Sequence, residues 1–233
     1  MIHTTTTSQP SSKMLAIRAV GPDATKFLQG QLTCNVTALH NGQVTLGAYC
    51  NIKGKVESLF YLELQDGEYY LYLHPDLLEP TLKELKKYSV FSKVELSGIA
   101  KSLPEIINQT EEEAILAKLP QIYAQTIGVF FPHDLNLPEL GAVSFTKGCY
   151  RGQEIVARMQ HRGKLKRSLY LFSSDSDPHV NPGDAISANG TAAGTVVRAS
   201  KDHSGKIIGL AVITDSLANE ALSLGNSEIH VVF

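Results

Sequence analysis

Hydrophobic and polar positions in the first hundred residues repeat with two different periods. Alternation of hydrophobic and polar residues predicts strands, and leucines at helical spacing between residues 76 and 88 predict an amphipathic helix. Asp23, after Gly21-Pro22, predicts the N-cap of an earlier helix, and Asp66-Gly67 predicts a hairpin turn. The strands are expected at residues 14–20, 44–50, 55–64, 69–73 and 90–96. The order β-α-β-β-β-α-β indicates an antiparallel sheet with helices on one face, which is an α+β arrangement.

The pattern changes near residue 165, where short hydrophobic runs recur between turns such as Asn189-Gly190. Regularly spaced short strands with such turns predict a small β-barrel. The runs lie at residues 169–172, 185–188, 194–198, 207–213 and 229–233. The sequence therefore predicts a tail at 1–12, an α+β region at 13–164 and a C-terminal β-barrel at 165–233. Within the first region, residues 111–119 predict a short helix that Pro120 ends.

Composition narrows the class of protein. The chain has 233 residues, 43% of them hydrophobic, and a formal net charge of −2, which argues against a protein wholly devoted to nucleic acid. Its three cysteines form no CxxC pair and no metal-binding spacing, so a cytoplasmic, reducing location without a bound metal is expected. The Thr/Ser-rich start resembles a disordered tail, and no hydrophobic run approaches the length of a membrane span.

Positive charge is concentrated in one stretch, residues 147–167, which contains seven of the 21 Lys/Arg residues and one acid, Glu154. Such a concentration indicates an anionic ligand, although a solvated helix face gives the same pattern. Within it, the octet (residues 147–154) reads Lys147-Gly148-Cys149-Tyr150-Arg151-Gly152-Gln153-Glu154. Cations and a helix N-terminus both stabilise a thiolate, which favours a reactive Cys149; the alternative is a small residue in a tight turn. Cys34 and Cys50 lie in hydrophobic elements and are expected in the core.

The octet resembles the K-G-C-Y-x-G-Q-E signature of the YgfZ-type folate-binding proteins, which are related to the glycine-cleavage T-protein, an aminomethyltransferase. Further similar stretches lie at residues 27–33, 48–55, 138–145 and 155–159. The resemblance implies a T-protein-like folate-binding fold, with antiparallel α+β modules and a C-terminal barrel around a folate channel. It also implies tetrahydrofolate binding and support of iron–sulfur enzymes, including a tRNA methylthiotransferase. Residues 98–137 are short for the second module of longer members.

The resemblance also implies the site. Cys149 is expected to be its reactive group. Folate contacts are expected in and after the octet, from Lys147, Gly148, Tyr150, Gly152, Gln153, Glu154, Arg158 and Arg162. Arg158, Arg162 and Lys164 suit the carboxylates of the folate tail. Amide partners for the pterin could come from Gln29, Gln31, Asn35 and Asn51, for which turn or cap chemistry is the alternative.

Two further functions stay open at this point. A folate-dependent aminomethyl transferase is one, but the chain has no clear counterpart of the catalytic aspartate motif of the T-protein, so activity of this kind is not expected. An RNA-binding module at residues 147–167 is the other. Direct tRNA binding there is disfavoured because Tyr150 is the only aromatic residue available for stacking.

Overall fold

The computed structural model describes residues 14–161, 166–176 and 179–232. Its N-terminal part is a five-stranded antiparallel sheet with the order β2-β3-β4-β1-β5. The strands are β1 (Leu15–Val20), β2 (Val44–Cys50), β3 (Val56–Gln65), β4 (Glu68–Leu73) and β5 (Glu95–Ile99). Helix α1 (Ala24–Gln31) follows β1, and α2 (Pro75–Tyr88) joins β4 to β5. The α+β prediction is confirmed, whereas the tail predicted at 1–12 lies outside the described residues.

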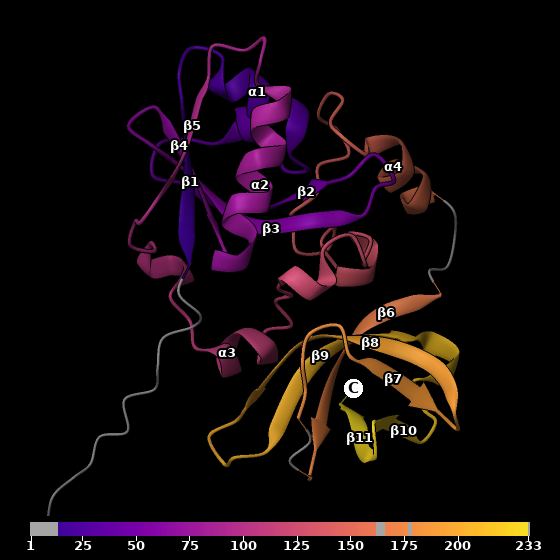
Figure 1. The fold of residues 1–233 in the computed structure, drawn as a ribbon. Helices are drawn as coiled ribbons and strands as arrows, with labels where there is room; N and C mark the ends of the chain where they lie inside the picture. The colour runs from indigo at the N-terminus through magenta and orange to yellow at the C-terminus, as the bar shows by residue number, and fades with distance from the viewer. Residues whose placement is uncertain (1–13, 162–165, 177–178, 233) are drawn as a thin grey trace, which may run out of the picture.

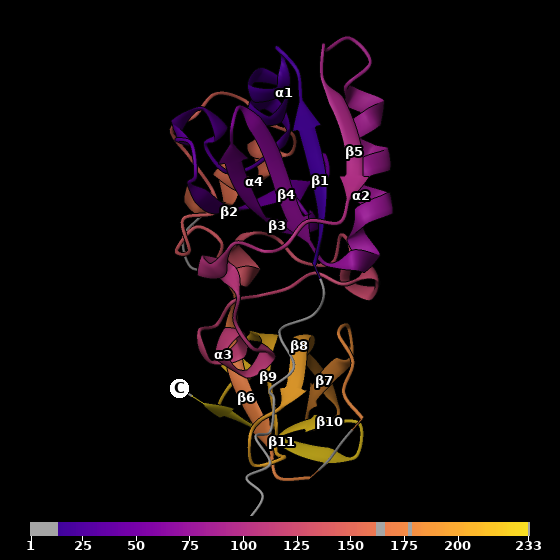
Figure 2. The same ribbon diagram turned by 90° about the vertical axis from the view of Figure 1, so that its left-hand side faces the viewer.

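Helix α2 covers one face of this sheet (Figures 1 and 2). Leu77, Leu82 and Leu85, three leucines of the predicted hydrophobic stripe, are buried against the sheet. Pro75 occupies the first turn, where a missing N–H costs no hydrogen bond, and the His74 ring accepts from the Asp76 N–H at 3.4 Å. The helical period in the sequence therefore corresponds to real packing against a hydrophobic core.

The strand predicted at residues 90–96 is wrong in its position, because β5 begins only at Glu95. Val90 and Phe91 are exposed in the loop between α2 and β5. The Asp23 carboxylate, predicted to cap α1, instead accepts from the Lys93 N–H at 2.7 Å and makes no side-chain cap bond. This contact fixes where the loop ends and shifts the strand towards the C-terminus. Hydrophobic character alone could not reveal the shift.

The connecting chain between the sheet and the barrel is rich in turns. Helix α3 (Glu111–Leu116) is shorter than predicted and begins with a capping box between Thr110 and Glu113. Helix α4 (Gln153–His161) begins with the last two residues of the octet. Short 3-10 helices occur at η1 (Val36–Ala38), η2 (Glu105–Ile107), η3 (Ala124–Thr126), η4 (His133–Leu135) and η5 (Asp215–Leu217). None of the helices in the described ranges is long and apolar enough to cross a membrane.

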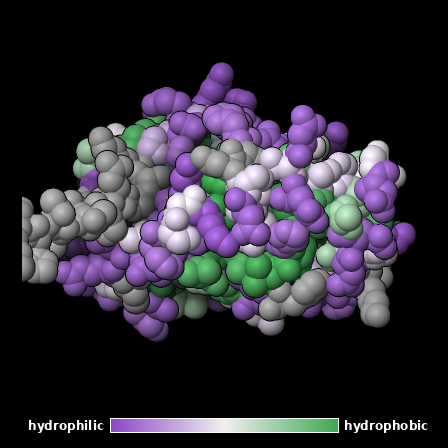
Figure 3. All heavy atoms as spheres, turned by 90° about the horizontal axis from the view of Figure 1, so that it is seen from below, coloured by the Kyte–Doolittle hydropathy of each residue, from purple (hydrophilic) through white to green (hydrophobic). Residues whose placement is uncertain are grey.

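The C-terminal part is a closed antiparallel barrel with the order β10-β11-β6-β9-β8-β7, which confirms the barrel prediction. Its strands are β6 (Arg167–Ser174), β7 (Ala185–Ala188), β8 (Thr191–Lys201), β9 (Ile207–Thr214), β10 (Leu222–Leu224) and β11 (Ser227–Val232). The three-residue β10 was not predicted, because so short a run has no measurable period. Phe172, Val196 and Ile213 are fully buried in the barrel core. From below, hydrophobic side chains are visible among the polar ones (Figure 3).

Candidate functional site

The octet forms a loop that is pressed against the turn between β2 and β3. Gly152 has φ +82°, a conformation that favours glycine, and a Cβ there would lie 2.5 Å from the Asn51 carbonyl oxygen. The Arg151 N–H donates to the Gly30 carbonyl at the end of α1, at 3.2 Å. Gly152 is therefore required for close packing of the octet on the sheet. The turn at residues 51–54 forms the opposite side of this contact.

Lys147 is buried and its ammonium group binds backbone. Nζ donates to the carbonyls of Leu32 at 2.7 Å and Cys34 at 2.8 Å, and lies 5.1 Å from the centre of the Tyr150 ring. Burial lowers the pKa of Lys147 to about 8, so these carbonyls still hold a mostly protonated ammonium group at neutral pH. The lysine therefore ties the octet to the segment after α1.

Arg151 has its guanidinium group between two aromatic rings, those of Tyr49 at 4.8 Å and Tyr88 at 4.9 Å. Nη1 donates to the Tyr49 hydroxyl and to Glu57 at 3.3 Å, and Nη2 lies 3.8 Å from Glu84. These partners come from β2, β3 and α2, so Arg151 joins three elements. The charged ends of both cations that flank Cys149 in the sequence thus have partners elsewhere.

The three cysteines have different environments. Cys149 is exposed, whereas Cys34 and Cys50 are buried, which confirms their expected place in the core. Burial raises the pKa of the Cys34 thiol to about 11 and that of the Cys50 thiol to about 12. Only Cys149 therefore presents an accessible sulfur to a reagent or a substrate.

Alkylation at neutral pH is expected to modify Cys149 before the other two cysteines. Exposure gives the reagent access to this sulfur, while burial removes both access and thiolate from Cys34 and Cys50. Mass spectrometry of peptides after a short iodoacetamide pulse measures the order, and the same pulse in denaturant provides the control. Equal labelling of all three sites in the folded protein would contradict this expectation.

Several predicted folate contacts have local partners. The Gln29 Oε1 accepts from the Val36 N–H at 2.7 Å, and its Nε2 donates to Asn35 at 3.0 Å. The Asn51 Oδ1 accepts from the N–H groups of Lys53 at 3.0 Å and Lys55 at 3.1 Å. These three amide side chains therefore perform the cap and turn chemistry that was the alternative to pterin binding.

The other residues predicted to contact folate have different environments. The Gln31 Oε1 and the Tyr150 hydroxyl are buried and have no hydrogen-bond partner among the described residues. Arg158 donates to Glu154 one helical turn earlier, at 2.7 Å. Gln153 begins α4, and Gly148 lies beside Cys149 with nothing within 4 Å of its Cβ direction. Arg162 and Lys164 lie outside the described residues.

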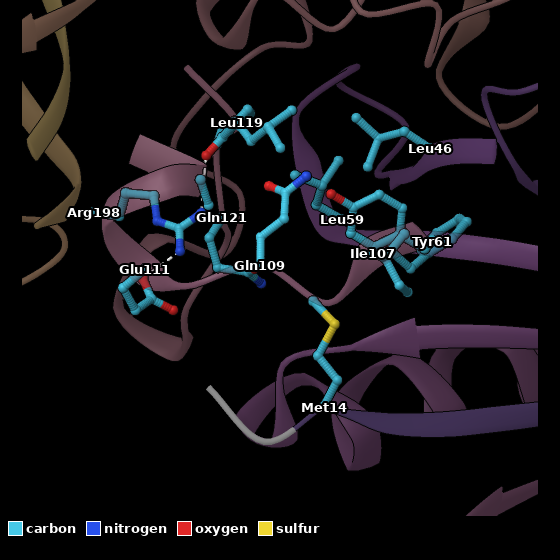
Figure 4. Close-up of a pocket in the computed structure, with 13 residues that line it drawn as sticks. Met14, Leu46, Leu59, Tyr61, Ile107, Gln109, Glu111, Leu119, Gln121 and Arg198 are labelled. Carbon is cyan, nitrogen blue, oxygen red and sulfur yellow. Dashed lines mark hydrogen bonds and ion pairs between the residues drawn. The ribbon is translucent and has the colours of Figure 1, made fainter. Parts of the chain in front are cut away.

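A pocket that the octet does not line lies between the sheet and the barrel (Figure 4). The enclosed cavity measures about 30 Å³, the space of one water molecule, so a larger ligand has to displace side chains of the lining. Hydrophobic side chains from the sheet and from the residue before β1 form one wall: Met14, Leu46, Leu59, Phe60 and Tyr61. Gln109 and Gln121 supply amides between this wall and the opposite side. The site therefore combines apolar surface with a few polar groups.

Arg198 of β8 closes the barrel side of the pocket and is only 4% exposed. Its Nη1 donates to the Leu119 carbonyl at 3.0 Å and its Nη2 to Glu111 on α3, while its Nε has no partner among the described residues. A buried cation keeps its charge only when such partners compensate for the missing water. Arg198 was not among the site residues predicted from the sequence. The available signal was a cation that directly follows two valines inside a barrel strand.

The fold and these sites define the class of protein. The structure is similar to that of aminomethyltransferase T of the glycine cleavage system from Bartonella henselae, with a TM-score of 0.71 and 13% identity over 96% of this chain and 83% of that chain. This similarity shows a T-protein-like fold, as expected from the sequence. No protein-family model matches the chain.

Curated relatives then define the family. The chain is 31% identical to tRNA-modifying protein YgfZ of Aliivibrio fischeri (strain MJ11), over 86% of this chain and 83% of that protein. It is 29% identical to tRNA-modifying protein YgfZ of Vibrio atlanticus, over 94% of this chain and 90% of that protein. An uncharacterized protein of Haemophilus influenzae is 34% identical, over 91% of both chains. The chain belongs to the YgfZ family.

Proposed function

We propose that this protein binds tetrahydrofolate in the pocket between the sheet and the barrel, and that it supports iron–sulfur enzymes that modify tRNA. The observation that carries the proposal is the pocket, with its apolar wall, two amides and a buried guanidinium group. The names of the relatives supply the tRNA-modification context, and the T-protein-like fold supplies the analogy to a folate-dependent enzyme.

The chemistry of the pocket lining suits a folate, and its side chains have to move apart to admit one. The pterin and the aminobenzoyl ring are flat and suit the wall that contains Leu59 and Tyr61. Pterin also offers donors and acceptors, for which Gln109 and Gln121 provide complementary amides. Arg198 offers a cation to a carbonyl or carboxylate of the ligand, beyond its bonds to Leu119 and Glu111. We assign the pterin ring to the apolar wall. The carbonyl or carboxylate of the ligand that accepts from Arg198 is assigned to the barrel side.

Aminomethyl transfer is not part of this proposal. Among the described residues that line the pocket, Glu111 is the only carboxylate, and it forms an ion pair with Arg198. A carboxylate held by a guanidinium group is a poor general base, since the ion pair stabilises its charged form. Tetrahydrofolate would therefore be bound without the acid–base group that such a transfer needs from the protein.

Cys149 is the proposed reactive group, at a place separate from the pocket lining. Lys147 holds the octet to the segment after α1, and Arg151 and Gly152 hold it to the sheet, so the loop presents an exposed sulfur on a fixed backbone. A thiolate is a nucleophile and a ligand for soft metals, both of which suit work on iron–sulfur enzymes. The proposal names the reacting group, the Cys149 thiol, and no individual reaction step.

In cells that lack this chain, the wild-type protein is expected to restore methylthiolated nucleosides in tRNA, and Cys149→Ser is expected to restore little. Oxygen replaces sulfur with a small change in volume but has almost no nucleophilicity at neutral pH. Mass spectrometry of digested tRNA measures the modification. Thr146→Ser, a conservative change in the same exposed loop, is the matched control and should act as wild type. Full restoration by Cys149→Ser would contradict the assigned role of the thiol.

A further inference from the structure

Three hydrophobic side chains project from the C-terminal end of α2 and the loop that follows it. Phe91 is 101% exposed, Val90 is 71% exposed and Tyr88 is 47% exposed. Exposed aromatic and aliphatic residues that stand together on a surface commonly mark an interaction site. None of these side chains lines the folate pocket, and Tyr88 contacts the octet through Arg151.

The loop is held in place on both sides. Within it, the Ser92 N–H donates to the Ser89 carbonyl at 2.8 Å. At its end, the Lys93 N–H donates to the Asp23 carboxylate at 2.7 Å, and the Asp23 N–H donates to the Lys93 carbonyl at 3.3 Å. Phe91 is therefore presented by an ordered backbone, which reduces the entropic cost when a partner binds.

Positive charge surrounds these hydrophobic residues. Residues 83–95 contain four lysines and two acids, Glu84 and Glu95, in a chain whose net charge is −2. The lysines are Lys83, Lys86, Lys87 and Lys93, and all four are exposed. Glu84 is paired with Lys87 and lies 3.8 Å from Arg151, so the other three lysines carry the excess positive charge. The local field therefore favours an anionic partner.

We propose that residues 83–93 form a binding surface for single-stranded RNA. Unpaired bases stack on Phe91 and on the exposed part of Tyr88, and the lysines contact the phosphates between them. The Arg151 guanidinium lies 4.9 Å from the centre of the Tyr88 ring and orients it. Because Arg151 belongs to the octet, RNA bound at this surface would lie beside the loop that carries Cys149.

RNA fits this surface better than it fits the basic stretch at residues 147–167. There the single aromatic residue, Tyr150, is 6% exposed and cannot stack with a base. Here two exposed aromatic residues, Tyr88 and Phe91, lie between lysines in the sequence, and binders of single strands combine such residues. A purely hydrophobic protein partner would gain little from the four lysines near Phe91. Binding here involves no residue of the folate pocket.

Fluorescence anisotropy with a short labelled single-stranded RNA tests the proposal, at several salt concentrations and against a duplex of the same sequence. Phe91→Ala is expected to weaken binding of the single strand at least about fivefold, since it removes one stacking platform. Lys86→Gln with Lys93→Gln is expected to lower the slope of the salt dependence by about 0.7 for each phosphate that the lysines no longer neutralise. Leu116→Ala and Lys118→Gln remove an exposed hydrophobic residue and an exposed cation at α3, and should leave binding unchanged.

The wild type should prefer the single strand to the duplex, because bases in a duplex are already stacked. No measurable RNA binding by the wild type, or equal binding by Phe91→Ala, would overturn the proposal. Binding to phosphatidylserine vesicles that Phe91→Ala abolishes, without RNA binding, would assign the surface to a membrane and also overturn it. Tetrahydrofolate binding, measured on the same samples, reports separately on the proposed function.

Discussion

Replacing Gly152 with alanine is expected to destabilise the protein by about 2–4 kcal/mol, through strain and overpacking at a fixed backbone position. Alanine rarely adopts the φ of +82° found here, and its Cβ would lie 2.5 Å from the Asn51 carbonyl oxygen. The next neighbours, the Gly54 Cα at 3.2 Å and the Cys50 Cβ at 3.3 Å, belong to the buried end of the hairpin. Since none of these atoms ends a flexible side chain, the octet must move away from the sheet.

The expected result is a fall in the melting temperature of about 5–15 °C, because about 1 kcal/mol corresponds to roughly 2–4 °C in a chain of this size. Circular dichroism or calorimetry measures it. Gly148→Ala is the matched control on the other side of Cys149, where nothing lies within 4 Å of the Cβ direction. This control should melt within a few degrees of wild type. Equal melting of Gly152→Ala and wild type would contradict the packing described for the octet.

The sequence predicted those parts of the fold that depend on local periodicity. The leucines of α2 and the alternating strands of the hairpin give strong patterns, because each element buries a single face. The position of β5 could not be predicted, since it depends on contact between Asp23 and Lys93, 70 residues apart. A strand as short as β10 gives no pattern, and it is defined by pairing with β7 and β11.

The site, like the fold, could be predicted where it depends on the local sequence and not where it depends on long-range contacts. The octet was recognisable because its residues are consecutive, and the exposure of Cys149 leaves its predicted reactivity open to test. The partners of Lys147 and Arg151 come from segments 63 to 115 residues away, so the flanking sequence could not predict these contacts. The pocket joins residues of the sheet, the connecting chain and β8, which only the tertiary fold brings together.

Removing the buried ion pair of the pocket is expected to weaken tetrahydrofolate binding about tenfold or more. A hydrogen bond to a charged group contributes about 1.5–3 kcal/mol, and about 1.4 kcal/mol corresponds to a factor of ten in affinity. Changing Arg198→Met together with Glu111→Gln removes both charges and leaves neither partner as an isolated buried ion. The double variant therefore tests the ligand contact with less damage to the fold than either single change.

The matched control is the exposed ion pair of the barrel between Lys206 and Asp175, which are 2.7 Å apart. Lys206→Met with Asp175→Asn removes a similar pair outside the pocket lining and should bind folate as wild type does. Thermal melting of both double variants shows whether each remains folded at the temperature of the titration. Any difference in affinity between them then reports on the pocket.

The decisive measurement is calorimetric titration of tetrahydrofolate into the wild type and these two folded double variants. We expect saturable one-to-one binding by the wild type and the control, and binding weakened about tenfold or more in the Arg198→Met, Glu111→Gln protein. Absence of saturable binding by the wild type, or equal affinity in all three proteins, would contradict the assignment of the pocket between sheet and barrel as the folate site.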